Sequence, residues 1–398
     1  MKLPFTPAPI GPARAAQFPV GAAVTLAELH ADPYPAYARL RAAEPVSWIP
    51  AAGMWMITRA DLARAVLLDD AAFTVGFDGS TVYDILGLHM MTLDGPAART
   101  EKVPFRASFT GSHVRATLAP AMVARVTQLI DGFRATGRAD LRHDFAARLP
   151  ILVMLDLFGL DDALEPDLRR WFKALEAGIG NIAQDSDIRA RGQQAADEFR
   201  TMIIAALARP KAALLADLAQ SDLTNDQIAR NASLVFFGGI STVEALILNA
   251  LHALATVDAL LDQLGDNPAL LDPLIEETVR FYGPVQSSHR HVTRSTQIGG
   301  IILPQGETVS VVQAACNRDP AVFADPDRFD LSRPATPRHI GFATGPHLCL
   351  GQHLARAQAR VALEGLVGAL AQLALSVDAP QGAEFRQPRT ATARWAKQ

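Results

Sequence analysis

Residues 225–255 constrain the fold most, because their apolar side chains recur at helical spacing without interruption. A helix of that length spans roughly 45–50 Å at about 1.5 Å per residue. Thr224 and Gln227 stand in front of it in the spacing of a capping box. The same periodicity recurs over residues 61–68, 116–133, 144–158, 193–207 and 352–370, so the middle and end of the chain are predicted to be helical.

Strand signals are fewer and shorter. Residues 46–50 and 54–57 flank Ala51–Gly53 and predict a hairpin, and residues 292–302 and 308–313 predict later strands. The sequence therefore predicts a mainly α fold with a minor β part. We expect one domain over residues 1–398, with a Pro-rich extended arm over residues 1–20.

Composition excludes several classes of protein. The net charge of −4 and the absence of a Lys/Arg-rich block argue against a nucleic-acid partner. The two cysteines, Cys316 and Cys349, cannot form a disulfide framework or a four-cysteine zinc site. The N-terminus lacks the unbroken apolar stretch of a signal peptide, and no uncharged run is long enough to cross a bilayer. We expect a cytoplasmic protein with no membrane partner.

The segment around Cys349 carries the most chemical information. A loop with a glycine and a proline delivers this cysteine to the start of the helix predicted over residues 352–370. Free backbone N–H groups and the helix dipole at such a position favour thiolate over thiol. An isolated cysteine is more often a buried, inert residue. The surrounding pattern, Phe-x-x-Gly-x-His-x-Cys-x-Gly, makes a ligand the better interpretation, whereas Cys316 is interpreted as a core residue.

This pattern resembles the haem-binding loop of the cytochrome P450 family, and the resemblance extends over almost the whole chain. It implies a cytochrome P450-type fold with a long central helix and a cysteine-ligand loop. It also implies that Cys349 is the axial thiolate, and thus the metal ligand, of a b-type haem. The neighbouring cofactor-binding residues are Phe342, Gly345, His347 and Gly351. Ala343 is a mild departure, because the family often has glycine at this position.

A second match is the pair Glu277 and Arg280, which share one face of a predicted helix. Most such pairs are solvated surface pairs. Here the spacing resembles the family's Glu-x-x-Arg, which implies a structural pair behind the haem, with Arg328 as its expected partner.

A third match lies in the middle of the long helix, at Gly238 and Gly239. Each glycine costs about 1 kcal/mol against alanine inside a helix, so a reason for both is expected. Close helix packing is one reading. A groove for a ligand, with the Thr242 hydroxyl beside it, is the other. The stretch resembles the family's oxygen-binding motif, Ala/Gly-Gly-x-Asp/Glu-Thr, but Ser241 stands where the acid is expected. The four residues are our candidate catalytic group.

The resemblance implies further cofactor contacts at the haem propionates. Arg290 and His347 match two family partners. The family usually has a His and an Arg where this chain has Ala98 and Lys102. Lys102 keeps the positive charge of the arginine but not its fork geometry, and Ala98 lacks the imidazole. We expect His289 to supply a replacement contact beside Arg290.

The substrate is expected to be apolar. A helix face with Leu234 and Phe237 is predicted to line its chamber. The resemblance implies that Val285, Gln286 and residues 74–91 complete the chamber. Residues 74–91 are rich in apolar side chains and carry no Arg or Lys.

The favoured function is a monooxygenase that inserts one atom of O₂ into a small to medium apolar substrate. The chain has no flavin or iron–sulfur signature, so family resemblance implies a separate ferredoxin and an NAD(P)H-dependent ferredoxin reductase. Two alternatives remain open. Ser241 motivates a peroxygenase that uses H₂O₂ on the same fold, and a non-enzymatic haem sensor or binding protein is the third interpretation.

Overall fold

The computed structural model describes residues 12–77, 80–181, 185–334 and 339–397. Contacts group the chain into two compact units, each assembled from segments that are distant in sequence. Unit 1 comprises Met1–Phe77, Ala245–Cys349 and Gln372–Arg394, and unit 2 comprises Asp78–Glu244, Leu350–Ala371 and Trp395–Gln398.

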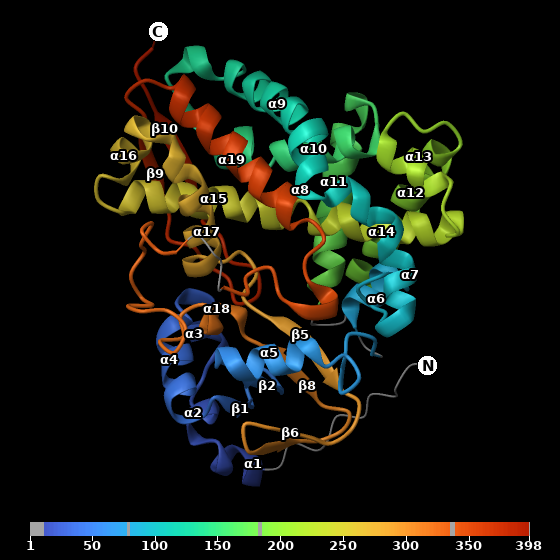
Figure 1. Ribbon diagram of the computed structural model, residues 1–398, viewed down its shortest axis with the longest axis vertical. Coiled ribbons are helices and arrows are strands. Elements are labelled where there is room, and N and C mark those ends of the chain that lie inside the picture. The colour runs from blue at the N-terminus through green and yellow to red at the C-terminus, as the bar shows by residue number, and fades with distance from the viewer. Residues whose placement is uncertain (1–11, 78–79, 182–184, 335–338, 398) are drawn as a thin grey trace. The chain divides into compact units, whose positions relative to one another are not determined.

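A five-stranded sheet organises unit 1 (Figure 1), in the order β1–β2–β8–β5–β3. Its strands are β1 (Val46–Ile49), β2 (Met54–Ile57), β3 (Phe73–Thr74), β5 (Ser288–Val292) and β8 (Thr308–Val311). Strands β2 and β8 are parallel and the other pairs are antiparallel. The predicted hairpin is confirmed as β1–β2, with Gly53 at φ +63° in its turn. Two further antiparallel pairs are β6–β7 (Thr296–Ile298, Ile301–Leu303) and β9–β10 (Ala374–Val377, Ala391–Arg394).

Unit 1 also contains helices and helical turns, of which those near the N-terminus pack against the sheet. The helices and turns are α1 (Pro12–Gln17), α2 (Pro19–Ala22), α3 (Leu26–Ala31), α4 (Tyr34–Ala43), α5 (Ala60–Leu68), α16 (Leu260–Asp266), η6 (Pro268–Leu270), α17 (Leu271–Phe281), α18 (Gln313–Cys316) and η7 (Gly345–His347). Trp48 and Trp55 meet edge to face across the hairpin, with ring centroids 5.6 Å apart, inside the main apolar cluster. Burial of these large side chains fixes the register of the two strands.

The N-terminal arm differs from the prediction. Residues 1–11 lie outside the described part of the chain, but Pro12–Gln17 and Pro19–Ala22 are short helices and not extended backbone. Pro19 stands at the first position of α2, where proline favours a helix start because its missing N–H has no intrahelical partner there in any case. Pro12 and Pro19 therefore begin helices.

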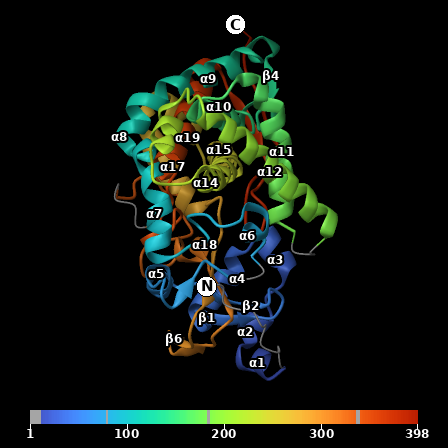
Figure 2. The ribbon, with the colours of Figure 1, turned by 90° about the vertical axis from the view of Figure 1, so that its right-hand side faces the viewer.

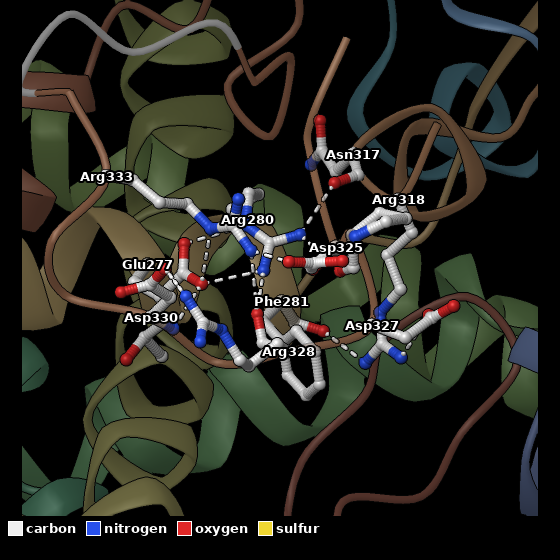
Figure 3. Close-up of polar contacts among 12 residues, drawn as sticks. Glu277, Arg280, Phe281, Asn317, Arg318, Asp325, Asp327, Arg328, Asp330 and Arg333 are labelled. Carbon is white, nitrogen blue, oxygen red and sulfur yellow. Dashed lines mark hydrogen bonds and ion pairs between the residues drawn. The ribbon is translucent and has the colours of Figure 1, made fainter. Parts of the chain in front are cut away.

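The Glu277–Arg280 pair is confirmed as a buried network (Figure 3). Arg280 donates to Glu277 twice, at 2.6 and 2.7 Å, and its remaining N–H groups donate to the carbonyls of Asn317, Pro326 and Arg328 at 2.7–3.0 Å. The expected partner was wrong in part. Arg328 contributes its backbone carbonyl, while its side chain pairs with Asp330. The guanidinium that meets Glu277 is that of Arg333, at 3.1 Å.

Unit 2 is almost entirely helical (Figure 2). Its elements before the long helix are α6 (Thr81–Leu86), α7 (Gly95–Arg106), η1 (Ala107–Phe109), α8 (Gly111–His113), η2 (Val114–Leu118), α9 (Ala119–Asp131), η3 (Arg134–Thr136), β4 (Arg138–Asp140), η4 (Arg142–Ala146), α10 (Leu149–Phe158), η5 (Asp162–Leu164), α11 (Glu165–Ile179), α12 (Ser186–Leu207) and α13 (Ala213–Ala219). Helix α19 (Gln352–Ala369) joins them from the end of the chain. Helices α11 and α12 lie side by side (Figures 1 and 2).

Aromatic stacking holds the centre of unit 2. Phe199 stacks on Phe236 with ring centroids 4.5 Å apart, and Phe158 and Trp171 meet Phe199 edge to face. Helix α10 is buried on nearly every side, as expected for a helix that other helices surround. The predicted mainly α fold with a minor β part is confirmed.

The long helix is present, but it is broken. Helix α14 (Asn225–Gly238) and helix α15 (Ser241–Thr256) are separated at Gly239 and Ile240. The capping box of Thr224 and Gln227 is confirmed at its start. By length and composition alone, Asn225–Thr256 could cross a membrane, with a mean hydropathy of 1.8 in its most apolar window. However, 72% of that window is buried inside the protein, as in a core helix.

Removing Glu277 should destabilise the protein far more than removing an exposed carboxylate. Glu277→Ala leaves the buried Arg280 without its counter-charge, which costs about 3–5 kcal/mol. The matched control is Asp61→Ala, which breaks the exposed pair with Arg59 and should cost no more than about 1 kcal/mol. Urea unfolding measures both free energies. Equal losses would show that the Glu277 network does not hold the fold.

Candidate active site

Cys349 lies at the end of a loop that turns back on itself. Its amide donates to the carbonyl oxygen of Phe342 at 3.0 Å, and the amide of Leu348 donates to that of Gly345 at 3.0 Å. The Cys349 residue is exposed, and α19 begins three residues further along the chain, at Gln352. The loop therefore presents a thiol at its surface, next in sequence to a helix N-terminus.

Two residues of this loop have left-handed backbone. Gly345 has φ +74°, and a Cβ added there would lie 2.6 Å from the carbonyl oxygen of Leu67 in α5. Glycine at position 345 is thus required by both conformation and space. Ala343 has φ +58°, which explains why the resemblance leads one to expect a glycine there.

The second cysteine has the opposite environment. Cys316 is 1% exposed and belongs to the main apolar cluster of unit 1. Burial raises the pKa of the Cys316 thiol far above its usual range. Its interpretation as a core residue is confirmed, and Cys349 is the cysteine that is accessible to a ligand.

The break between α14 and α15 shapes the second candidate site. The Thr242 hydroxyl donates to the carbonyl oxygen of Gly238 at 2.8 Å. Gly238 is exposed, and a Cβ added there would meet no atom within 4 Å, so open space adjoins the helix at this point. At Gly239 a Cβ would lie 2.8 Å from the methyl group of Met154. Thus Gly239 serves close packing, whereas Gly238 faces open space.

On its buried side, this break carries a serine and a glutamate. Ser241 is 7% exposed and Glu244 is 8% exposed. The Nε atom of Arg142 donates to Glu244 Oε1 at 3.2 Å. Burial nevertheless raises the pKa of the Glu244 carboxyl above its ordinary value, and the attraction of Arg142 offsets this only in part.

The residues predicted to line a substrate chamber differ in exposure. In unit 2, Leu234 is buried, and the ring of Phe237 stacks on Phe172 at 6.0 Å. In unit 1, Val285 is half-buried and forms an isolated β-bridge with Phe385. Gln286 is fully buried, and its amide nitrogen donates to the carbonyl oxygen of Gly283 at 2.6 Å. Val285 and the exposed Phe385 therefore offer the apolar surface in this part of unit 1.

The predicted propionate partners occupy both units. In unit 1, Arg290 is buried and donates to the carbonyl oxygen of His289 at 2.8 Å, and His347 is half-buried in η7. In unit 2, Ala98 and Lys102 stand one turn apart on α7, with Lys102 half-buried.

Sequence reasoning did not find the carboxylate that meets His289. The Nε2 atom of His289 lies 3.3 Å from Glu384 Oε1, and Ser287 donates to Glu384 Oε2 at 2.7 Å. Burial alone would lower the pKa of His289, but the hydrogen bond that His289 donates to Glu384 and the charge of Glu384 together raise that pKa. The two residues are about 95 positions apart in sequence and share no motif, so no local signal indicated the pair.

Comparisons with known proteins identify the family. A family model described as Cytochrome P450 matches residues 170–371. Cytochrome P450 monooxygenase PikC of Streptomyces venezuelae is 33% identical over 372 residues, which cover 87% of this chain and 86% of that protein. The 6-deoxyerythronolide B hydroxylase of Saccharopolyspora erythraea is 30% identical over 378 residues, which cover 88% and 91%.

Solved structures agree with these relatives. A crystal structure of P450BioI, in complex with an acyl carrier protein ligated to hexadec-9Z-enoic acid, matches with a TM-score of 0.84 and 26% identity, covering 92% of this chain and 99% of that one. The chain belongs to the cytochrome P450 family. Since its named relatives are monooxygenases and hydroxylases, it is an oxidoreductase of the monooxygenase type.

The family implies a haem, and the residues present fit one. Cys349 is an accessible thiol, which is a ligand that iron accepts. Cβ atoms added at Gly238 and Gly351 would meet no atom within 4 Å, so neither glycine is packed closely against the described part of the chain. Arg290 in unit 1 and Lys102 in unit 2 are basic side chains of a kind that pairs with carboxylates.

The two glycines of the cysteine loop should respond differently to alanine. Gly345→Ala forces a side chain into left-handed backbone, which costs about 1–2 kcal/mol, and it also collides with Leu67. Gly351 has φ −84° and open space around it, so Gly351→Ala should leave stability unchanged. Urea unfolding of the haem-free protein compares the two, and a larger loss for Gly351→Ala would contradict this account of the loop.

Proposed function

We propose that this protein is a haem b monooxygenase of the cytoplasm that oxidises a small to medium apolar substrate with electrons from separate redox partners. The observation that supports it best is the accessible Cys349, presented by a loop in which Gly345 matches the family pattern and has left-handed backbone. The helix break at Gly239 and Ile240, with open space beside the neighbouring Gly238, supports it independently.

Cys349 would hold the haem iron through its thiolate, and the bound haem would supply oxygen activation. Phe342, Gly345 and Gly351 would give the loop its shape and leave room for the ring. The remaining cofactor contacts would come from basic and hydrogen-bonding side chains, namely His347, Arg290, Lys102 and His289.

The helix break would serve the reaction through its hydroxyl groups. The carbonyl oxygen of Gly238 accepts a hydrogen bond from the Thr242 hydroxyl. This bond holds the hydroxyl beside the open space at Gly238. Gly239 permits the close approach of Met154 that the broken helix requires. Ser241 lies on the buried side, where a hydroxyl can pass a proton but cannot store one as a carboxyl does.

Apolar surface would bind the substrate. Leu234 and Phe237 from α14 and Val285 from unit 1 are the proposed contacts, with Gln286 bracing the backbone behind Val285. Phe385, Leu88 and Met91 are large apolar residues that remain exposed. Burying such side chains against a ligand contributes about 25 cal/mol for each Å² removed from water.

Replacing the two cysteines tests the ligand assignment. Cys349→Ala should abolish the red-shifted Soret band of the ferrous CO complex, because that band reports a thiolate ligand. Cys316→Ala is the matched control and should retain the band, since Cys316 is buried in the core. The absorption spectra of both CO complexes decide the matter. A band that survives in Cys349→Ala would overturn the proposed ligand.

An acidic ferredoxin would dock on positive charge in unit 2. Arg115 and His353 both approach Gly111, within 3.3 Å of the position of an added Cβ, and burial together with the charges of Arg356 and Arg115 lowers the pKa of His353. Arg360 follows Arg356 by one turn on α19. We define Arg115, Arg356 and Arg360 as the basic patch.

Charge reversal in the basic patch should slow reduction by the ferredoxin. Arg115→Glu or Arg356→Glu should lower the second-order rate constant by about tenfold at low salt, and added salt should narrow the difference. Arg209→Glu, on the turn after α12, is the control with the same charge change. Stopped-flow reduction measures the rates, and equal slowing in all three variants would argue for another docking surface.

Ser241 favours a second candidate, a peroxygenase that uses H₂O₂, because that oxidant already carries the protons that a missing acid would supply. Product formed from H₂O₂, together with none from O₂ and any reductant, would establish it in place of the monooxygenase.

A further inference from the structure

We propose that Glu244 replaces the acid missing at position 241, holding a proton on the buried side of the helix break and passing it through Ser241 toward Thr242. The proposal rests on the proposed monooxygenase function. It concerns only unit 2, because Glu244 is the last residue of that unit's long segment.

Position in the helix supports this role. Ser241 and Glu244 are three residues apart in the first turn of α15, so they share a face. Both are buried, whereas Thr242 is half-buried and bonds to Gly238 at the edge of the open space. Glu244 thus stands one turn beyond the position of the absent acid, on the same face of the helix.

The surroundings of Glu244 favour a carboxyl that keeps its proton. Arg142 and His143 from η4 and Arg169 from α11 attract the charged form, while burial opposes it more strongly and raises the pKa. Glu176, also on α11, is exposed as a residue, but its carboxyl loses part of its water, and this loss and then the charge of Glu244 raise its pKa. The charge of Glu244 thus disfavours a second charge on Glu176, so the two carboxyl groups are coupled in their titration.

Glu176 also offers a route to water. Glu176 is exposed, whereas Glu244 is buried. A proton could therefore pass from water to Glu176 and from there to Glu244. In the proposed transfer, the O–H bond of Glu244 breaks and its proton goes to Ser241 Oγ. The former hydroxyl proton of Ser241 leaves toward Thr242, and Glu244 regains a proton from water by way of Glu176.

The alternative is a structural pair in which Arg142 merely ties α15 to η4. Glu244→Gln separates the two readings, because glutamine has nearly the same shape and its amide oxygen still accepts from Arg142, but it cannot titrate. Glu101→Gln is the matched control. Glu101 is equally buried in unit 2, and it accepts from Asn231 on α14 at 2.8 Å.

The first readout needs no turnover. Infrared spectra of the haem-loaded protein should show a protonated carboxyl band that persists well above pH 4.3, the ordinary value of a glutamate being about 4.3. The band should vanish in Glu244→Gln and remain in Glu101→Gln. A band that Glu244→Gln leaves unchanged overturns the proposal, whatever the enzyme oxidises.

The second readout is the coupling of the reaction, which is the share of reducing equivalents that ends in product and not in H₂O₂. With O₂ and reductant, Glu244→Gln and Ser241→Ala should each lose several-fold more reducing equivalents as H₂O₂, and product formation should fall by at least about tenfold. The double variant should be no worse than either single one, since both lie on one route. Glu244→Asp should restore part of the coupling, and turnover driven by supplied H₂O₂ should change little.

The proposal also predicts the direction in which coupling changes with pH. Glu244 supplies a proton only while it is protonated, so wild-type coupling should fall as pH rises through its raised pKa, and this fall should be absent in Glu244→Gln. Coupling that is unaffected by Glu244→Gln overturns the relay and leaves the monooxygenase intact. A wild type that consumes no O₂ with any reductant would instead refute the proposed function, and the infrared result would still stand.

Discussion

One guanidinium sets the path of the chain that leads to the cysteine loop. Each of the five N–H donors of Arg280 has an acceptor, two on Glu277 and three on backbone carbonyls of a stretch without helix or strand. A stretch of that kind cannot satisfy its own carbonyls through regular structure, so it needs fixed donors from elsewhere. Lysine could not replace this arginine, because it has three donors and no planar fork.

The helices could be predicted because their burial leaves a period in the sequence. Helices α5, α10, α12 and α19 fall where apolar spacing indicated them. The break at Gly239 could not be located in the same way, because two glycines are compatible with both close packing and a break. The structure assigns packing to Gly239 and open space to Gly238, a distinction that depends on the neighbours of each residue and not on residue type.

The candidate site was predictable where a short pattern encodes it. The cysteine loop follows from ten consecutive residues, Phe342–Gly351, of which five are specified by the pattern, and its left-handed positions explain why glycine is favoured there. Contacts between distant segments of the chain are not encoded in any local sequence pattern. Arg333 and Arg328 lie close together in sequence with the same charge, so only the folded chain shows that the first meets Glu277. Likewise, nothing in the sequence indicates that Glu244 is buried and Glu176 exposed.

The interleaving of the two units has a consequence for how the protein is made on the ribosome. Strand β2 pairs in parallel with β8, and Trp55 and its partner Val309 are about 250 residues apart, a separation that makes loop closure slow. The edge of β2 that later pairs with β8 therefore stays unpaired while the segment from α6 to α14 is synthesised. Such an edge can pair with another chain. A nascent chain that stalls before residue 308 has its central strand missing, so yield in a foreign host should depend on translation speed and chaperones more than on the stability of the finished fold.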